Sequence, residues 1–462
     1  MARHLPVVQM KSSIRHDGSR ATVHPADVSG RFTRARRAVF AVLLALYLVI
    51  PWITLGGNPA VLLDLPGRRF YLMGRLFNAQ DGFLLFFVLA GIGITLILVT
   101  TILGRVWCGW ACPQTVFLEA VFRPIQRLIE GNREARMRRE AKDWDFDRTW
   151  RRVLLWSLYA VIASLLAHAF LGYFFPVRTL VGMILGGPGE HPEAFLAVTV
   201  ATGLIFFDVA WFREQLCLAI CPYGRLQSAM TDPDSLVVGY DTTRGEPRGK
   251  AKAEGVGDCV DCNRCVVVCP TGIDIRNGLQ LDCIACTQCI DACDEVMDKL
   301  HRPRGLIRYD SLNGLMGRAR HFLRPRLFIY AAVIVLWVVG LAITLRTRVE
   351  FETNLLRLQG APYTLEGDTV RNAFDIHLVN KRNARTTFRV EPQDAGAPGL
   401  QFVIPLREVT LDPLAGTHLP IFVTMPRSAF RGDVPLRIRV RPTGAGDAET
   451  RTVTAPFLGP AN

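Results

Sequence analysis

The sequence predicts a membrane protein with three parts: five transmembrane helices, a cysteine-rich domain before the fifth helix, and a C-terminal antiparallel β-sandwich. Three observations support this fold class. Half of the 462 residues are hydrophobic and the mean hydropathy is +0.22, which is too apolar for an ordinary soluble domain. Five long stretches carry few or no charges. All twelve cysteines lie between residues 108 and 293, so both ends of the chain contain none.

Each apolar stretch, folded as a helix, can cross a hydrocarbon core of roughly 30 Å. A single stretch of this kind is often a buried core helix, but five of them with alternating flanking charge disfavour that interpretation. The polar N-terminus lacks the apolar core and cleavage site of a secretory signal. The predicted spans are 38–55, 83–103, 153–175, 194–212 and 327–345.

Basic residues between the spans predict the orientation. Lys and Arg number eight in 1–37, three in 56–82, eleven in 104–152, one in 176–193 and sixteen in 213–326. Because short basic loops stay in the cytoplasm, the N-terminal tail and the cysteine-rich segment are predicted to be cytoplasmic, and the C-terminal domain external. Orientation and anionic lipid then explain the net charge of +13 without a nucleic-acid partner.

The cysteine-rich segment repeats the spacing Cys-x2-Cys-x2-Cys-x3-Cys twice, which is typical of bacterial ferredoxins with two [4Fe-4S] clusters. In such ferredoxins the fourth cysteine of each run binds the cluster of the other run. The expected ligands of the first cluster are Cys259, Cys262, Cys265 and Cys293, and those of the second are Cys283, Cys286, Cys289 and Cys269.

Other uses of these eight cysteines fit less well. A tetrahedral zinc site needs four ligands rather than eight in this register. A disulfide framework belongs to small secreted domains in oxidising compartments. The second run ends in Cys293-Asp294 where the ferredoxin signature has Cys-Pro, a change that removes no ligand.

The other four cysteines form two Cys-x3-Cys-Pro motifs, each following a predicted span. If each motif is helical, its two thiols share one face, and the following proline favours a helix break. The two motifs together predict a four-thiol site that suits Cu(I), zinc or iron-sulfur iron, or a reducible disulfide. The residues are Cys108, Cys112, Cys217 and Cys221.

Four further residues are weaker candidates. His168 lies in the third span without a partner histidine in the other spans, so packing is favoured over haem ligation. Asp208, near the inner end of the fourth span, is expected to pair with Arg213. Met73 and Met183 lie in outer loops and are expected to pack, although thioethers also bind copper.

Residues 350–462 contain short alternating segments separated by Gly and Pro, which predicts an antiparallel β-sandwich. The clearest segments are 374–379, 401–405, 420–424 and 434–440.

These motifs resemble the FixG/CcoG/RdxA family of membrane polyferredoxins, accessory proteins for haem-copper cytochrome c oxidase assembly. The resemblance rests on GRVWCGWACPQTVFLE at 104–119, WFREQLCLAICPYGRLQSAM at 211–230, RGEPRGK at 244–250 and the whole of 257–311. It implies a tail at 1–37, a four-helix region at 38–230, a cytoplasmic ferredoxin domain at 231–326, a fifth helix at 327–345 and a periplasmic immunoglobulin-like domain at 346–462.

The resemblance also implies a function. The protein would be a cupric reductase of the bacterial inner membrane, in which Cys108, Cys112, Cys217 and Cys221 handle copper and the ferredoxin cysteines deliver electrons from an unidentified cytoplasmic donor. Oxidase subunits or copper assembly factors would receive Cu(I). Two alternatives remain open: a quinol-linked electron-transfer subunit, since such polyferredoxins also carry Cys-x3-Cys-Pro motifs, and a non-enzymatic assembly factor that docks through the β domain.

Overall fold

The structure is a computed structural model that describes residues 23–78, 81–251, 253–321, 323–347, 350–382, 384–393, 399–432, 434–443 and 449–460. The predicted N-terminal tail therefore lies outside the described residues up to position 22. The chain forms two compact units, one of residues up to 53 with 86–339, the other of 54–85 with 340–462.

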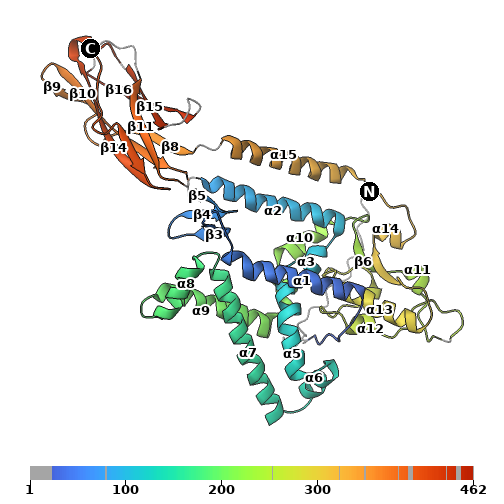
Figure 1. Cartoon of the computed structure of the whole chain (residues 1–462). Helices are drawn as coiled ribbons and strands as arrows, with labels where there is room; N and C mark the ends of the chain where they lie inside the picture. Colours follow the sequence, from blue (N-terminus) through green and yellow to red (C-terminus); the bar gives the residue numbers. More distant parts are fainter. Residues whose placement is uncertain are drawn as a thin grey trace. The chain divides into compact units, whose positions relative to one another are not determined.

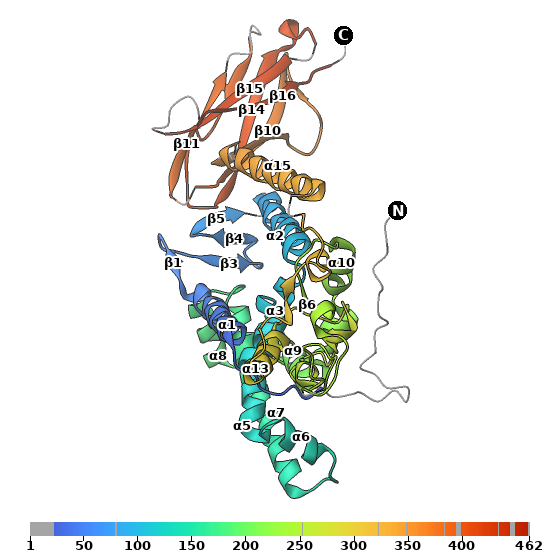
Figure 2. The same cartoon turned by 90° about the vertical axis from the view of Figure 1, so that its right-hand side faces the viewer.

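Five helices are long and apolar enough to cross a membrane, which confirms the five predicted helices. Their middle side chains point outward, as Leu89 (61% exposed) and Leu336 (71%) illustrate. Helices α2 and α15 run side by side (Figures 1 and 2), and Trp337 Nε1 donates to Phe87 O over 3.1 Å. The helices are α1 (Arg31–Val49), α2 (Gly82–Leu103), α7 (Phe146–Leu171), α9 (Pro192–Phe207) and α15 (Pro325–Thr347).

Two of these helices begin before the predicted spans. Helix α1 starts at Arg31 rather than at 38, and α7 starts at Phe146 rather than at 153. Arginine favours helix and extends each one beyond its apolar part. Asp145 caps α7 by accepting the N–H of Arg148 over 2.7 Å.

Short helices connect the spans. After α2 come α3 (Val106–Trp110), α4 (Pro113–Phe117), a π-helical turn (Leu118–Phe122), α5 (Arg123–Glu130) and α6 (Arg133–Glu140). Helix α8 (Val177–Gly186) precedes α9, and two π-helical turns (Asp208–Phe212 and Leu216–Ile220) lead to α10 (Pro222–Met230).

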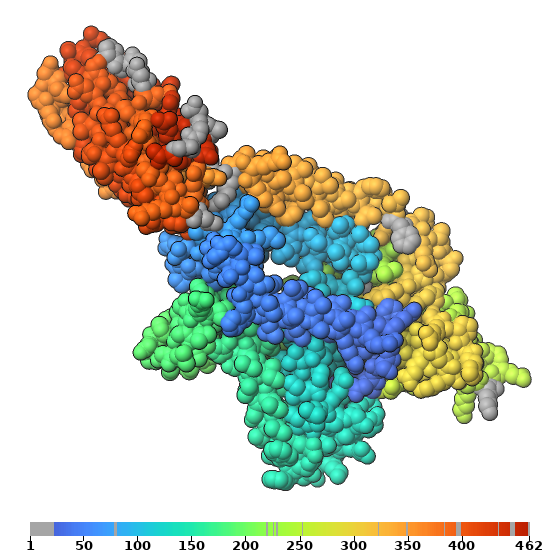
Figure 3. Space-filling view, viewed as in Figure 1, coloured from blue at the N-terminus to red at the C-terminus, as the bar shows by residue number. Residues whose placement is uncertain are grey.

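Strands β6 and β7 come before and after the cysteine-rich segment in the sequence and pair antiparallel. Its core includes Ile290, Met297 and Ile307. It packs on the start of α1, where Asp291 accepts bonds from the N–H and hydroxyl of Thr33, each 2.7 Å long, and Figure 3 shows α1 beside this segment. The elements are β6 (Val237–Tyr240), α11 (Thr242–Gly245), α12 (Arg264–Val267), a 3-10 turn (Ile275–Asn277), α13 (Gln288–Lys299), β7 (Ile307–Asp310) and α14 (Leu312–Leu315).

The C-terminal residues form the predicted sandwich. One sheet has the order β12-β14-β10-β8 with β9 beside β10, and the other has the order β13-β11-β15-β16. Alternate residues such as Phe374, Ile421 and Ile438 fill the core between the sheets. The strands are β8 (Phe351–Arg357), β9 (Thr364–Glu366), β10 (Thr369–Asn380), β11 (Thr386–Gln393), β12 (Gln401–Val403), β13 (Glu408–Leu411), β14 (Gly416–Pro426), β15 (Val434–Pro442) and β16 (Arg451–Phe457).

The first interhelical loop is also folded, which the sequence analysis did not predict. Phe70 and Phe77 stack at 5.1 Å and form a small core with Leu84 and Leu341, while Asp81 pairs with buried Lys381 over 3.7 Å. This loop and the sandwich therefore belong to one unit. Its strands are β1 (Thr54–Leu55), β2 (Asn58–Pro59), β3 (Val61–Asp64), β4 (Arg69–Leu72) and β5 (Arg75–Asn78).

Candidate functional site

The eight ferredoxin-type cysteines line two separate small cavities. Cysteines from both runs surround each cavity. The first is lined by Cys259, Cys262, Cys265 and Cys293, and the second by Cys269, Cys283, Cys286 and Cys289, with Cys265 at its edge. Each cavity thus combines three cysteines of one run with the fourth of the other.

The backbone follows the same path around both cavities. Asp261 and Asn263 in the first run have φ angles of 53° and 57°, and Ala285 and Thr287, at the equivalent positions of the second run, have 53° and 64°. Residues other than glycine rarely adopt this left-handed conformation. Alternating right-handed and left-handed residues turn successive N–H groups to one side, an arrangement found around iron-sulfur clusters.

Burial makes the cavities unfavourable for free thiolates. It raises the pKa of Cys265 and Cys293 to about 12 and that of Cys283 to about 11, with neighbouring thiols adding to the effect. The ionised sulfur that binds iron is therefore stable here only beside a cation. Cys262 differs from the other seven because its side chain is exposed.

The cavities fit a cluster better than a single ion. No three His, Cys, Asp or Glu side chains converge as ligands of one metal ion anywhere in the described ranges. A cubane of four irons and four sulfides holds its cysteine sulfurs around a larger centre than one ion does. Four cysteines around a small enclosed cavity match this donor set.

The two Cys-x3-Cys-Pro motifs have nearly identical local structure. Cys112 and Cys221 both have extended backbone, with φ and ψ of −61° and 127° and of −60° and 111°. Each donates its N–H over 2.8 Å to the carbonyl five residues earlier, Trp107 O and Leu216 O.

The prediction that the two thiols of each motif share one face of a helix is therefore wrong. The helix ends before the second cysteine, and Pro113 and Pro222 begin the next helix, a position where proline is favoured. The first thiol of each pair lies within one short helical segment, and the second lies directly before the next helix.

The four thiols of these motifs are neighbours in space. Gln227 of α10 donates to Cys108 Sγ over 3.4 Å, and Gln114 of α4 donates to Arg213 O over 3.0 Å. Burial raises the pKa of Cys217 to about 12, and Cys112, Cys108 and Cys221 raise it further. Burial also raises the pKa of Cys108 to about 11. Both motifs thus contribute to one group of half-buried thiols whose ionised forms would repel one another.

The first thiol motif contacts the loop that carries Cys283 and Cys286. A Cβ atom on Gly109 would lie 2.6 Å from Ile284 O and 2.8 Å from Ala285 O, so only glycine permits this approach. Tyr309 joins the same contact, accepting from Trp110 Nε1 over 3.2 Å and donating to Ala285 O over 3.0 Å.

Two arginines reinforce this contact. Arg36 Nε donates to Gly109 O over 2.9 Å. Arg105 donates to the carbonyls of Leu281 and Cys283 and also to Gly224 O in α10, so it connects the cysteine loop with both thiol motifs. The second cavity, rather than the first, therefore adjoins the four thiols.

A buried charge network supports the second thiol motif. Arg123 pairs with both Glu119 and Glu214, and all three side chains are less than one-tenth exposed. Although burial alone would raise the pKa of Glu214, the charges of Arg123 and Arg213 outweigh it and lower that pKa. Glu214 lies two residues before the turn that holds Cys217, so the network helps to fix the position of this thiol.

The expected pairing of Asp208 with Arg213 does not occur. Arg213 Nη2 donates to Gln126 Oε1 over 2.6 Å, and no ion pair in the described part of the chain joins Arg213 to Asp208. The π-helical turn between them ends in a left-handed residue, since Arg213 has φ 52°, and this directs the arginine away.

His168 and Met183 line the same cavity, which their positions in the sequence do not indicate. They line an apolar cavity of about 610 Å³ between α7, α8 and α9, and His191, at the start of α9, lines it too. His168 Nδ1 lies 2.7 Å from Ser164 O. Met73 is 84% exposed in a turn and is not part of this cavity.

Arg123 is expected to be essential for stability. Arg123→Met removes the buried ion-pair partner that Glu119 and Glu214 share, which should cost about 3–5 kcal/mol. Thermal unfolding of the purified protein should show a lowered midpoint. The control is Lys299→Met, which removes an exposed pair with Glu295 worth about 0–1 kcal/mol; equal shifts in both variants would contradict the assignment.

Comparisons with protein families agree with this architecture. Residues 212–312 match the family described as a 4Fe-4S dicluster domain, which confirms the predicted ferredoxin domain. Residues 341–460 match the IG-like fold at the C-terminus of FixG. Residues 84–132 match a 4Fe-4S binding domain, although this stretch contains only Cys108 and Cys112 of the twelve cysteines.

Three relatives match along most of their length. The chain is 36% identical to protein RdxA of Cereibacter sphaeroides, over 94% of this chain and 96% of RdxA. It is 39% identical to protein RdxB of the same organism, over 80% and 82% of the two chains. It is 36% identical to the nitrogen fixation protein FixG of Rhizobium meliloti, over 89% and 88%. The iron-sulfur domain, the apolar helices and these relatives agree, and the chain belongs to the FixG/RdxA family.

Proposed function

We propose that this iron-sulfur electron-transfer protein is a cupric reductase that passes electrons through two [4Fe-4S] clusters to Cu(II) at the four-thiol group. The observation that carries the proposal is the contact of Gly109 with Ile284 and Ala285, which joins a cluster-binding loop to a thiol motif. The cluster-binding loop and the thiol motif are therefore adjacent, and no large movement is needed for an electron to pass between them.

The cavities support the crossed ligation expected from the spacing. Each is lined by three cysteines of one run and the fourth of the other. We assign Cys259, Cys262, Cys265 and Cys293 to a distal cluster, and Cys283, Cys286, Cys289 and Cys269 to a proximal cluster beside the thiols. Bound clusters supply one-electron storage.

Exposure gives the route a direction. Cys262 is the exposed cysteine of the distal set, so a cytoplasmic one-electron donor has its shortest access there. The proximal set has no exposed cysteine and lies beside Gly109. Electrons would enter at the distal cluster and leave from the proximal one.

The four thiols are expected to bind Cu(I), the product, more tightly than Cu(II), the substrate. Thiolate is a soft ligand that prefers Cu(I), so a thiol site makes reduction of Cu(II) easier. One electron from the relay converts one Cu(II) to one Cu(I), and each thiol that binds copper loses its proton. Because burial raises the pKa of Cys108 and Cys217 to about 11 and 12, copper binding should strengthen as the pH rises.

The location follows from the distribution of basic residues. The basic loops support a bacterial inner-membrane protein with its ferredoxin domain in the cytoplasm and its β domain in the periplasm. Cu(I) would pass to copper assembly factors or to subunits of a haem-copper cytochrome c oxidase.

A quinol-linked function is the second candidate, favoured by the cavity of about 610 Å³ that His168 and His191 line. Apolar cavities with a few polar groups are typical of sites for small apolar ligands. Rapid reduction of the clusters by a quinol analogue without copper, abolished by His168→Ala, would favour this function over cupric reduction.

The crossed ligation predicts pairs of matching variants. Cys259→Ala and Cys293→Ala should remove the same cluster and leave identical electron paramagnetic resonance spectra from the other. Cys283→Ala and Cys269→Ala should share a different residual spectrum. Iron should fall from about eight atoms per chain to about four in each variant. If Cys259→Ala resembles Cys269→Ala instead, each run binds its own cluster.

Removal of the four thiols should abolish copper reduction. The variant in which Cys108, Cys112, Cys217 and Cys221 are all Ser should keep about eight irons per chain, but its dithionite-reduced clusters should no longer be reoxidised by Cu(II) under anaerobic conditions. Stopped-flow absorbance measures this reaction. Met73→Leu and Met183→Leu serve as controls and should react as the unmodified protein does.

Two outcomes of this experiment have opposite meanings. Full copper reduction by the four-serine variant would contradict the proposal. About twelve irons in the unmodified protein, reduced to about eight in the variant, would show that the thiols hold a third cluster rather than copper.

Gly109→Ala should slow cluster reoxidation by Cu(II) while the iron content stays constant. The added Cβ would collide with two backbone carbonyls that cannot rotate away, so α3 must move from the proximal cluster. Gly93→Ala in α2 is the matched control, because its Cβ meets nothing within 4 Å. Equal rates in both variants would exclude this contact as the electron path.

A further inference from the structure

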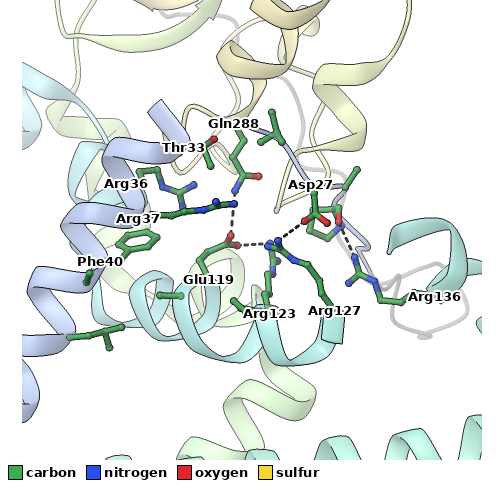
Figure 4. Close-up of a pocket in the computed structure, with 17 residues that line it drawn as sticks. Asp27, Thr33, Arg36, Arg37, Phe40, Glu119, Arg123, Arg127, Arg136 and Gln288 are labelled. Atoms are coloured by element: carbon green, nitrogen blue, oxygen red, sulfur yellow. Dashed lines mark hydrogen bonds and ion pairs between the residues drawn. The ribbon is translucent and has the colours of Figure 1, made fainter. Parts of the chain in front are cut away.

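A cavity of about 390 Å³ lies where the start of α1 meets α5, α6 and the segment before α1. Five arginines line it: Arg36, Arg37, Arg123, Arg127 and Arg136. Figure 4 shows Arg36 and Arg136 on opposite sides of this cavity, with Arg123 and Arg127 between them.

The cavity has more positive than negative charge. Its carboxylates are Asp27 and Glu119, which pair with Arg127 (2.6 Å) and Arg123. None of the ion pairs in the described ranges includes Arg36, Arg37 or Arg136. Among the described residues, no carboxylate therefore forms a direct ion pair with these three guanidinium groups, although Glu130 and Asp27 are near enough to act on the charge of Arg136.

Two of these arginines are buried with an unused donor. Arg36 is 2% exposed and Arg136 is 6% exposed, yet Arg36 Nη2 and Arg136 Nε have no hydrogen-bond partner among the described residues. Another nitrogen of each side chain does donate a bond, since Arg36 Nε binds Gly109 O (2.9 Å) and Arg136 Nη2 binds Pro25 O (3.0 Å). A buried unpaired charge is costly, so both groups require an anionic partner.

The electrostatics of Arg136 agree with this need. Burial lowers its pKa, and the charges of Arg123 and Arg213 lower it further. Arg136 therefore lies in an environment that already repels positive charge, and an anion in the cavity would relieve that repulsion.

One wall of the cavity is apolar. Phe40, Ala41 and Leu44 follow Arg36 and Arg37 along α1, inside the apolar span. The cavity thus extends from a cluster of guanidinium groups to a surface suited to hydrocarbon. Phosphate is a favoured partner of arginine, because the guanidinium group matches its oxygens in a bidentate manner.

We propose that this cavity binds a phosphate group, supplied by the headgroup of an anionic phospholipid whose acyl chain lies along α1, or by free phosphate. Arg36 Nη2 and Arg136 Nε are the donors that bind it. Since Arg36 also holds Gly109 O, the bound phosphate would lie next to the contact between the thiol motif and the cysteine loop.

The test uses the full chain in nanodiscs that contain equal amounts of phosphatidylglycerol and phosphatidylcholine. After extraction, native mass spectrometry measures which lipid stays bound. The unmodified protein should retain phosphatidylglycerol, and Arg136→Gln and Arg36→Gln should each weaken this retention by about tenfold or more, because a charge-assisted bond is lost. Arg34→Gln, which removes an exposed charge from the same helix, should change nothing.

A second arm distinguishes the two sources of phosphate. Inorganic phosphate is titrated into delipidated protein in neutral detergent, followed by calorimetry. Phosphate binding that Arg136→Gln abolishes, without preference for phosphatidylglycerol, supports the site with free phosphate as the ligand.

The proposal is overturned if neither probe binds, or if Arg34→Gln weakens retention of phosphatidylglycerol as much as Arg136→Gln does. Arg36→Gln and Arg136→Gln each remove a bond to a backbone carbonyl as well, to Gly109 O and to Pro25 O, so the outcome is decided by whether both variants lose the same ligand.

Discussion

The close approach of Gly109 to the carbonyls of Ile284 and Ala285 is the constraint on which the rest of the site depends. It joins a segment that follows a transmembrane helix to a loop more than 170 residues later in the chain. Arg36, Arg105 and Tyr309 each donate to a backbone carbonyl at this contact. Without a side chain at position 109, backbone packs on backbone, and the cysteines on either side become neighbours.

The burial of charged groups and of thiols destabilises the structure around this contact. Arg123, Glu119 and Glu214 are removed from water, and the cysteines of both groups are largely enclosed. Buried ions and buried thiols are each unfavourable unless paired or bound to a metal. The carboxylates meet this requirement through Arg123, and the ferredoxin-type sulfurs would meet it through the iron of bound clusters. The unfavourable burial of charged groups and thiols therefore occurs mainly at the site, where ion pairs and bound metal would offset it.

The sequence predicted those features that depend on local spacing. Apolar length located the five helices, and alternation located strands such as β10 and β14. Cysteine spacing also defined two groups of four, which the cavities reproduce. The sequence did not predict features that depend on contacts between residues far apart in the chain. The strands at 61–78 are short and need Leu341 to complete their core. The rotation of Arg213 away from Asp208 depends on π-helical and left-handed turns without a sequence signature, whereas the proline after the second cysteine did indicate the helix break at Cys112.

The left-handed residues Asp261, Asn263, Ala285 and Thr287 have a consequence for biogenesis. None of the four is glycine, and although Asp and Asn tolerate this conformation, Ala285 and Thr287 adopt it against their own preference. A bound cluster would offset that cost. A chain inserted into the membrane during iron starvation would keep its apolar helices and its sandwich but lack a properly closed cysteine domain. Maturation of the protein then depends on the supply of prefabricated clusters rather than on synthesis of the chain.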